Sequence, residues 1–179
     1  TGDNGDAAPI CPHVGPPVLD PSTFPACGDA TSGAHCLKTS LVPPALVSSL
    51  AACTNGYCVP DKIIAAGGRY VPKTCTSVAG AEGRCASIVL PQVAAQANLP
   101  VDTCDANERC APCFNPLDGK DTGICHTSCD PGPTKPAVTL AACCGTNGKC
   151  APKSMIPASE LPYLNACSGD DVCVPNENL

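Results

Sequence analysis

Residues 43–60, PPALVSSLAACTNGYCVP, contain the pattern that decides the fold. Two prolines precede a short apolar stretch, which runs into a cysteine, a turn at Gly56 and a second cysteine followed by Val-Pro. Proline is favoured at the first helical position, and Leu46, Leu50 and Cys53 fall at helical spacing. The pattern therefore predicts two or three turns of helix with Cys53 on the buried face, and a tight turn in which Gly56 supplies a positive φ.

Close pairs of cysteines with similar surroundings recur along the whole chain. They are Cys27/Cys36, Cys53/Cys58, Cys75/Cys85, Cys104/Cys110, Cys125/Cys129, Cys144/Cys150 and Cys167/Cys173. In five of these pairs, proline stands two positions after the second cysteine. A short module that recurs at such intervals cannot bury its apolar face alone, so neighbouring modules must stack. We therefore predict a small disulfide-rich repeat protein: a quasi-linear array of cysteine-pinned modules made of short helices and irregular loops, with little β-structure.

The bonds between the cysteines have two possible arrangements. Bonds within each close pair are the arrangement that we expect, and bonds between modules are the alternative that the sequence leaves open. The spacing predicts four segments, which are an N-terminal arm (1–26), a first half of cysteine-pair repeats (27–113), a degenerate central repeat (114–143) and C-terminal repeats (144–179).

The composition indicates an exported protein. The 179 residues include 17 cysteines but no Trp, two Phe and three Tyr, so disulfides replace a large aromatic core. Such a density of cysteines suits an oxidising compartment. The chain starts at Thr1, and no apolar targeting segment precedes the first cysteine, so we expect a secreted, extracellular protein whose signal peptide has been removed.

Three cysteines remain outside the seven close pairs: Cys11, Cys113 and Cys143. Because the total is odd, at least one thiol cannot be paired within one chain. The spare thiol is either buried as a small apolar side chain or bonded to another copy of the chain. Cys11 is the best candidate for the intermolecular bond, since it follows an acidic, glycine-rich leader and stands apart from the repeat.

The charge and hydropathy of the chain argue against a nucleic-acid partner and against a membrane span. The net charge is -6 and Lys and Arg do not cluster, whereas nucleic-acid binding depends on neutralising phosphates with basic groups. The longest apolar stretches, such as Leu41–Leu50, are short and interrupted by prolines. We expect no nucleic-acid partner and no membrane span.

Metal and redox motifs are weak. The C-x-x-C of Cys110 and Cys113 is not flanked by a βαβ pattern, which argues against a thioredoxin-like redox pair. The sequence contains an incomplete set of possible ligands for each of zinc, copper and calcium. These sets are Cys143-Cys144 with Cys125-His126 for zinc, the scattered His13, His35, His126 and Met155 for copper, and Asp118 and Asp121 of the NPLDGKDTG turn for calcium.

No hydrolase motif is present, neither G-x-S-x-G nor H-E-x-x-H, and no surrounding motif orients the three histidines as bases. We therefore predict no catalytic, cofactor-binding or metal site. For the calcium turn, we favour a plain polar turn, and for the zinc set we favour disulfides.

The second half of the chain carries a resemblance. The segments CDANERCAPCFNPLDGKDTGICHTSC (104–129), CCGTNGKCAPKSMIP (143–157) and CVPNENL (173–179) resemble cysteine-rich secreted proteins and lipoproteins of myxobacteria and related predatory or soil bacteria. The resemblance implies an extracellular or Gram-negative envelope setting and carries no assigned activity. Thr1 stands where a lipoprotein would have its lipid-bearing cysteine, so we expect a released form.

Two functions remain by elimination, and neither is enzymatic. The first is a structural subunit that assembles with copies of itself into a disulfide-stabilised filament, tube or coat on a cell surface. The alternative is a monomeric binding module, such as an adhesin or a protease inhibitor. The size of the native protein distinguishes the two.

Overall fold

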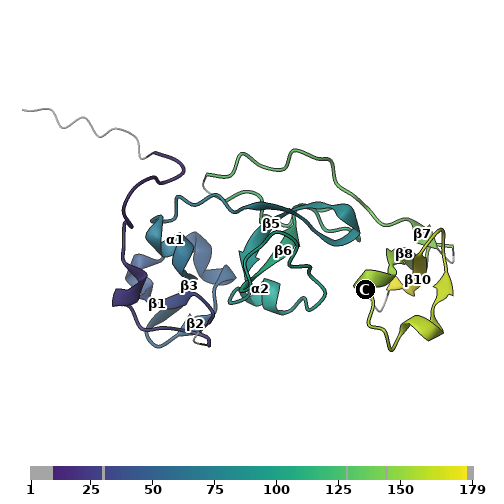
Figure 1. Ribbon diagram of the computed structural model, residues 1–179, viewed down its shortest axis with the longest axis horizontal. Coiled ribbons are helices and arrows are strands. Elements are labelled where there is room, and N and C mark those ends of the chain that lie inside the picture. The colour runs from purple at the N-terminus through teal and green to yellow at the C-terminus, as the bar shows by residue number, and fades with distance from the viewer. Residues whose placement is uncertain (1–9, 30, 128, 144, 177–179) are drawn as a thin grey trace, which may run out of the picture.

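The computed structural model describes residues 10–29, 31–127, 129–143 and 145–176. Within these residues the chain forms three small antiparallel β-sheets, which follow one another in chain order along the long axis of the molecule (Figure 1). The expectation of little β-structure is therefore wrong: strands hold most of the described cysteines. The leader before Pro9 lies outside the described residues.

The three sheets share one plan. The first has the order β1-β3-β2, the second β4-β5-β6 and the third β7-β8-β10-β9. Their strands are β1 (Ala34–Lys38), β2 (Ala52–Cys53), β3 (Gly56–Pro60), β4 (Thr74–Thr76), β5 (Glu82–Ser87), β6 (Glu108–Pro112), β7 (Ala142–Cys143), β8 (Gly148–Pro152), β9 (Asn165–Ala166) and β10 (Asp171–Pro175). Each sheet is built around one five-residue ladder, formed by β1 with β3, β5 with β6, and β8 with β10.

Each ladder places two cysteines directly opposite one another, and these two are not bonded to each other. They are Cys36 and Cys58, Cys85 and Cys110, and Cys150 and Cys173. Each of them instead bonds to a cysteine on the segment beyond the strand that it faces. The two bonds of a sheet are therefore nested in sequence but cross in the spatial order of the strands, and we call them crossed disulfides. The bonds are Cys27–Cys58 with Cys36–Cys53, Cys75–Cys110 with Cys85–Cys104, and Cys143–Cys173 with Cys150–Cys167.

The expected bonds within close pairs are wrong, because the register of the strands separates the two members. Cys53 faces Gly56 across the β2–β3 turn, whereas Cys58 lies two residues further along and faces Cys36. None of the seven close pairs is bonded within itself. Each sheet instead takes its four cysteines from two regions of sequence, so one close pair does not make a structural module.

The three cysteines proposed as unpaired or intermolecular are also bonded within the chain. Cys11 bonds to Cys129, Cys113 to Cys125, and Cys143 to Cys173. Cys143 thus occupies the place in the third sheet that the sequence assigned to Cys144, which lies outside the described residues. The β7 strand also begins before residue 144, inside the segment expected to be a degenerate central repeat.

Helices are short and occupy the connections. The α-helices are α1 (Asp61–Ala65) and α2 (Pro91–Ala94), and the 3₁₀ turns are η1 (Pro21–Thr23), η2 (Thr39–Leu41), η3 (Pro44–Ser49), η4 (Val78–Gly80), η5 (Lys153–Met155) and η6 (Leu161–Tyr163). The helix expected to end in Cys53 is only the η3 turn, and Cys53 lies in β2. Pro44 does begin the turn, but the disulfide to Cys36 and the pairing of Ala52 with Tyr57 hold the following residues extended.

Each sheet has its own small apolar core. The buried clusters are Leu37, Val42, Val59 and Ile64 for the first sheet, Ala86, Leu90, Val93, Leu99 and Ala111 for the second, and Leu140, Ala151, Val172 and Val174 for the third. Clusters of this size leave a domain marginal unless covalent links reduce the entropy of the unfolded chain. Each crossed disulfide closes a loop of 17 to 35 residues and contributes about 3 kcal/mol or more in the chain-entropy model.

Polar contacts join neighbouring sheets. The Lys62 ammonium lies 2.6 Å from Asp105 and 2.8 Å from Glu108, which links α1 to the second sheet. The Asn107 amide donates to the carbonyl of Ser32 at 2.9 Å across the same boundary. On the other side, the Asn98 amide donates to the carbonyl of Met155 at 2.8 Å, so the second sheet contacts both of its neighbours.

Glycine is required at Gly56 for a reason that the sequence did not indicate. The positive φ in this turn belongs to Asn55, at 64°. A Cβ on Gly56 would lie 1.8 Å from the backbone oxygen of Leu37, because β1 and β3 approach closely there. Gly148 has the same role in the third sheet, where a Cβ would lie 2.7 Å from the backbone oxygen of Val174.

The substitution Gly56→Ala should lower the free energy of unfolding by more than about 2 kcal/mol, because the backbone of β1 must move to admit the methyl group. Gly80→Ala is the matched control, since Gly80 has φ 75° but no atom within 4 Å of its added Cβ. That control should cost about 1 kcal/mol. Urea unfolding measured by circular dichroism compares the two, and equal losses would contradict the close approach.

Proteolysis without reductant, followed by mass spectrometry, should recover peptides that join Cys27 to Cys58 and Cys36 to Cys53. The crossed arrangement requires both, because Cys36 and Cys58 face each other on β1 and β3 but each bonds to another segment of the chain. Recovery of a bonded Cys53/Cys58 peptide would contradict it. Prior alkylation of free thiols, without reduction, guards against exchange during digestion.

Candidate functional site

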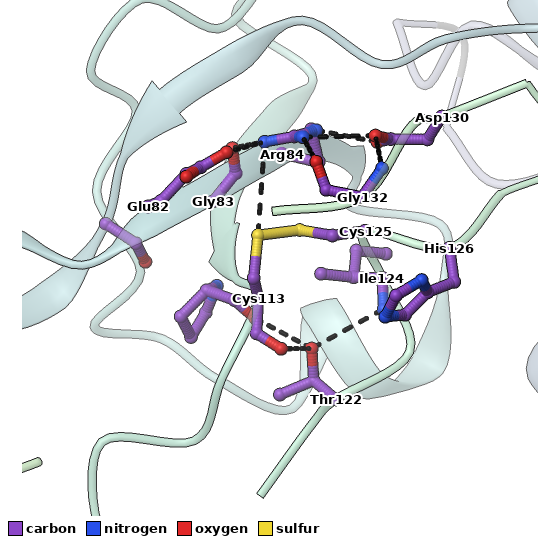
Figure 2. The surroundings of a disulfide bond; sticks show 12 residues. Glu82, Gly83, Arg84, Cys113, Thr122, Ile124, Cys125, His126, Asp130 and Gly132 are labelled. Atoms are coloured by element: carbon purple, nitrogen blue, oxygen red, sulfur yellow. Dashed lines mark hydrogen bonds and ion pairs between the residues drawn. A yellow bond between two sulfur atoms is a disulfide. The ribbon is translucent and has the colours of Figure 1, made fainter. Parts of the chain in front are cut away.

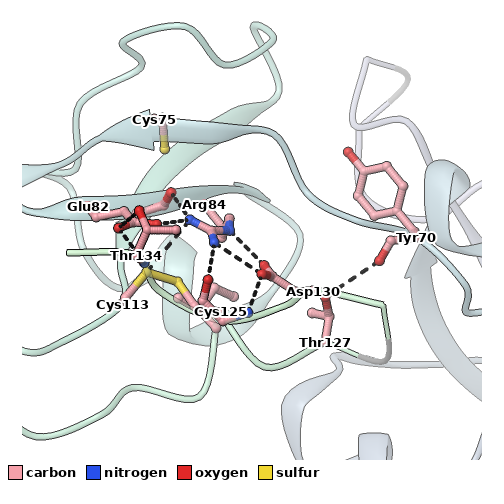
Figure 3. Close-up of polar contacts among 12 residues, drawn as sticks. Tyr70, Cys75, Glu82, Arg84, Cys113, Cys125, Thr127, Asp130 and Thr134 are labelled. Atoms are coloured by element: carbon pink, nitrogen blue, oxygen red, sulfur yellow. Dashed lines mark hydrogen bonds and ion pairs between the residues drawn. A yellow bond between two sulfur atoms is a disulfide. The ribbon is translucent and has the colours of Figure 1, made fainter. Parts of the chain in front are cut away.

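Among the described residues, Arg84, Glu82 and Asp130 form a buried ionic cluster. Arg84 on β5 is only 3% exposed and points toward residues 130–138, an extended segment that we call the strap. Its guanidinium donates to Asp130 at 2.6 and 3.1 Å and to the carbonyl of Gly132 at 2.9 Å (Figure 3). On its other side it donates to Glu82 at 2.8 Å.

Glu82 holds the next part of the strap. Its second carboxylate oxygen accepts hydrogen bonds from the backbone N–H groups of Thr134 and Lys135 at 2.8 and 2.7 Å and from the Thr134 hydroxyl at 2.9 Å. Burial opposes ionisation of Glu82, but the hydrogen bonds from Arg84, Thr134 and Lys135 outweigh it and lower its pKa to about 2. Glu82 therefore stays ionised when exposed carboxyls begin to take up protons.

The same balance applies to Asp130 and Arg84. Burial opposes the ionisation of Asp130, but the hydrogen bonds from Arg84 and Gly132 prevail and lower the pKa of its carboxyl. Asp130, and then Glu82, raise the pKa of Arg84. The Cys113–Cys125 disulfide lies against this cluster, with Cys113 Sγ 3.9 Å from the guanidinium (Figure 2).

The cluster is structural in its chemistry. Its donors and acceptors are directed at each other and at the strap backbone, which leaves the ionic groups engaged within the chain rather than presented to a ligand. Two further contacts hold the strap's flanks: Thr127 donates to the carbonyl of Tyr70, and Cys129 bonds to Cys11. The cluster was not predicted from the sequence. The signal available for it was the i, i+2 spacing of Glu82 and Arg84, which places both side chains on one face of a strand.

The histidines do not come together. His35 lies 2.6 Å from Asp61, and His126 lies 2.6 Å from Asp121. His13 contacts the carbonyl of Pro16. In the part of the chain that the structure describes, none of the three is hydrogen-bonded to a hydroxyl or thiol that would serve as a nucleophile.

The partial metal and redox sets are also separated or engaged. Cys110 and Cys113 of the C-x-x-C bond to Cys75 and Cys125, so they do not form a redox pair with each other. The cysteines that gather closely enough to ligate a metal are already in disulfides. Asp118 accepts the backbone N–H of Lys120 and pairs with its ammonium, and Asp121 accepts from Gly123, as in a plain polar turn.

An open groove of about 550 Å³ lies on the third sheet. Its lining comes from the β7–β8 turn and the start of β8, from the stretch that runs from the end of η6 to the start of β9, and from β10 and the residue after it. The lining residues are Asn147, Gly148, Tyr163, Leu164, Asn165, Cys173, Pro175 and Asn176. None of them carries a charge. Tyr163 is 86% exposed, whereas the other four aromatic rings of the chain are partly buried.

This groove was not predicted from the sequence. The residues are contributed by three segments between positions 147 and 176, and each segment looks like an ordinary turn in sequence. The available signal was Tyr163 itself, a rare aromatic residue next to Pro162 in a stretch with few apolar neighbours of its own size. Its position beside three asparagines depends on the crossed disulfides of the third sheet.

The eight disulfides fit an extracellular, disulfide-stabilised protein. Among the described residues, the helices are all too short to cross a lipid bilayer. No family model, curated protein or solved structure matches this chain. The resemblance to myxobacterial cysteine-rich proteins therefore stays a prediction.

The ionic cluster should make stability depend on pH in one direction. The folded pKa of Glu82, about 2, is below its usual value near 4.5, so its contribution is complete above pH 4.5 and is lost as pH falls toward 2. Glu82→Gln should be less stable than the wild type at pH 7, and the difference should shrink between pH 4.5 and 2. Urea midpoints measured at pH 7, 5, 4, 3 and 2.5 test this.

The exposed Glu160→Gln variant is the control for that comparison. Its urea midpoint should follow the wild type across the same pH series. If Glu82→Gln also followed the wild type, the cluster would not hold the strap on the second sheet.

Proposed function

We propose that this protein is a secreted, monomeric, non-enzymatic binding protein in which three disulfide-pinned sheets support a recognition surface. One observation carries the proposal: Cys11, Cys113 and Cys143, which the sequence leaves outside its close pairs, are bonded within the chain. A polymer bonded through any of these three cysteines therefore loses its support. The rigid scaffold and the uncharged groove with an exposed Tyr163 fit a binding protein better.

The N-terminal arm supports a monomer. Besides the Cys11–Cys129 bond, the backbone N–H of His13 donates to the carbonyl of Arg69 at 2.9 Å, and that of Val18 donates to the carbonyl of Ala65 at 2.8 Å. The arm that was expected to reach a neighbouring copy thus lies along α1 and the residues that follow it in its own chain.

The absence of catalysis is part of the proposal. The described histidines are paired with carboxylates or a backbone carbonyl, and the most strongly perturbed carboxyl, Glu82, is hydrogen-bonded to the strap instead of lining a groove. Activation of a nucleophile requires a base within hydrogen-bond reach of it. The groove on the third sheet is lined by amides and apolar groups, which suit binding.

Non-covalent self-assembly is the second candidate, and the apolar surface of the arm favours it. Ile10 and Val14 are 71% and 79% exposed, and Val18 and Leu19, later in the same arm, are 46% and 37% exposed. Apolar side chains that are contiguous and exposed mark interaction surfaces. Packing of this arm against a second copy would bury them without a disulfide.

Size-exclusion chromatography with light scattering at neutral pH, without reductant, distinguishes the candidates. We expect one species at 17.9 kDa across a hundredfold range of concentration. Larger species would overturn the monomer. Val14→Asp should dissolve assemblies that pack through the arm. Cys144→Ser should remove any assembly bonded through this cysteine, which lies outside the described residues.

A further inference from the structure

The groove on the third sheet is held open before any ligand binds. The backbone N–H of Asn176 donates to the carbonyl of Asn147 at 3.0 Å, and the Asn176 side chain donates to the carbonyl of Thr146 at 2.9 Å. These bonds join the end of β10 to the β7–β8 turn. The Cys143–Cys173 and Cys150–Cys167 bonds fix the strands beneath. A groove set in this way loses little conformational entropy on binding.

The polar groups of the lining are amides. Asn147 and Asn165 are exposed, and neither side chain is hydrogen-bonded within the described residues. Each amide group offers two N–H donors and an oxygen acceptor. A ligand hydroxyl is itself both donor and acceptor, so amides match hydroxyls without requiring a fixed charge on either partner.

The aromatic ring supplies the apolar part of the site. Tyr163 is the one aromatic side chain of the chain that stands exposed. Tyrosine gives a large, rigid, amphipathic contact surface at a low cost in side-chain entropy, and asparagine beside it gives adaptable hydrogen bonds. The C–H face of a pyranose ring has the size and apolarity to lie against such a ring, while its hydroxyls point outward.

The lining selects against charged ligands. None of its eight residues is ionisable at neutral pH, and the chain as a whole has a net charge of -6. A phosphate, sulfate or uronate group would meet no cation in the groove and would be repelled by the chain's net charge. A cationic ligand would meet no carboxylate in the lining.

We propose that the Tyr163 groove binds a neutral glycan, with a sugar ring stacked on Tyr163 and its hydroxyls bonded to Asn147 and Asn165. The volume of about 550 Å³ suits a short stretch of a polysaccharide chain. This inference rests on the proposed binding function and specifies its ligand. Two sources share the chemistry, namely soluble oligosaccharides and the surface of an insoluble polysaccharide.

Titration of the intact, oxidised protein with oligosaccharides tests the inference by two-dimensional ¹⁵N NMR and tyrosine fluorescence. The neutral probes are cellohexaose, xylohexaose, mannohexaose, maltohexaose and N-acetylchitohexaose, and hexagalacturonate is the anionic control. At least one neutral probe should shift the amide signals of Asn147 and Asn165 and change the fluorescence. Hexagalacturonate should do neither. No response to any neutral probe would overturn the inference.

Variants separate stacking from general surface contact. Tyr163→Ala should weaken binding at least about tenfold, because exposed tyrosines at binding sites commonly contribute that much or more. Tyr163→Phe should stay within about threefold, since the ring remains. Asn165→Ala should weaken binding severalfold. Val14→Ala removes an exposed apolar side chain that is far from the groove in sequence, so it should leave the binding affinity unchanged.

Superimposable NMR spectra outside the groove establish that each variant is folded. Binding that Tyr163→Ala leaves unchanged would overturn the assignment of this groove. Co-sedimentation with cellulose, chitin and starch particles distinguishes an insoluble source from a soluble one. If the protein is a monomer by light scattering and binds no neutral probe, only this inference is contradicted. If the protein is a polymer, the proposed function is contradicted.

Discussion

The crossed pair of disulfides in each sheet is the constraint on which the rest of the structure depends. Each ladder of five residue pairs sets two cysteines opposite one another. Each of these two cysteines bonds to a cysteine on the segment beyond the strand that it faces. The apolar clusters are small, and units with cores of this size are marginal in water without covalent links. Cross-links that restrict the unfolded chain supply the stability that such cores cannot. The close backbone approach at Gly56 follows from the same compact hairpins.

The strap shows how the chain connects the second and third sheets without adding a core. Arg84, Glu82 and Asp130 are buried together, which costs desolvation free energy that only complete hydrogen bonding offsets. The bonding extends to the backbone of Gly132, Thr134 and Lys135, so the cluster specifies where an extended segment lies.

Rigidity connects this architecture to the proposed function. A protein whose strands are cross-linked presents its surface loops in one geometry, which suits recognition of an extended, repetitive ligand. The groove beside Tyr163 is built from turns of the third sheet, and its walls are joined by backbone hydrogen bonds. The arm, bonded through Cys11 to the region before the strap, is part of the same cross-linked body.

The sequence by itself determined the dependence on disulfides and the thinness of the core, because both follow from the numbers of cysteine and aromatic residues. It also indicated that a proline begins the turn at Pro44. Only the tertiary structure decided that Cys58 bonds to Cys27 and not to Cys53, that Cys53 lies in a strand, and that Tyr163 stands beside three asparagines. The physical reason is that a disulfide or a groove requires side chains to meet in space. Strand register, set by pairings between residues that are distant in the chain, determines which side chains meet.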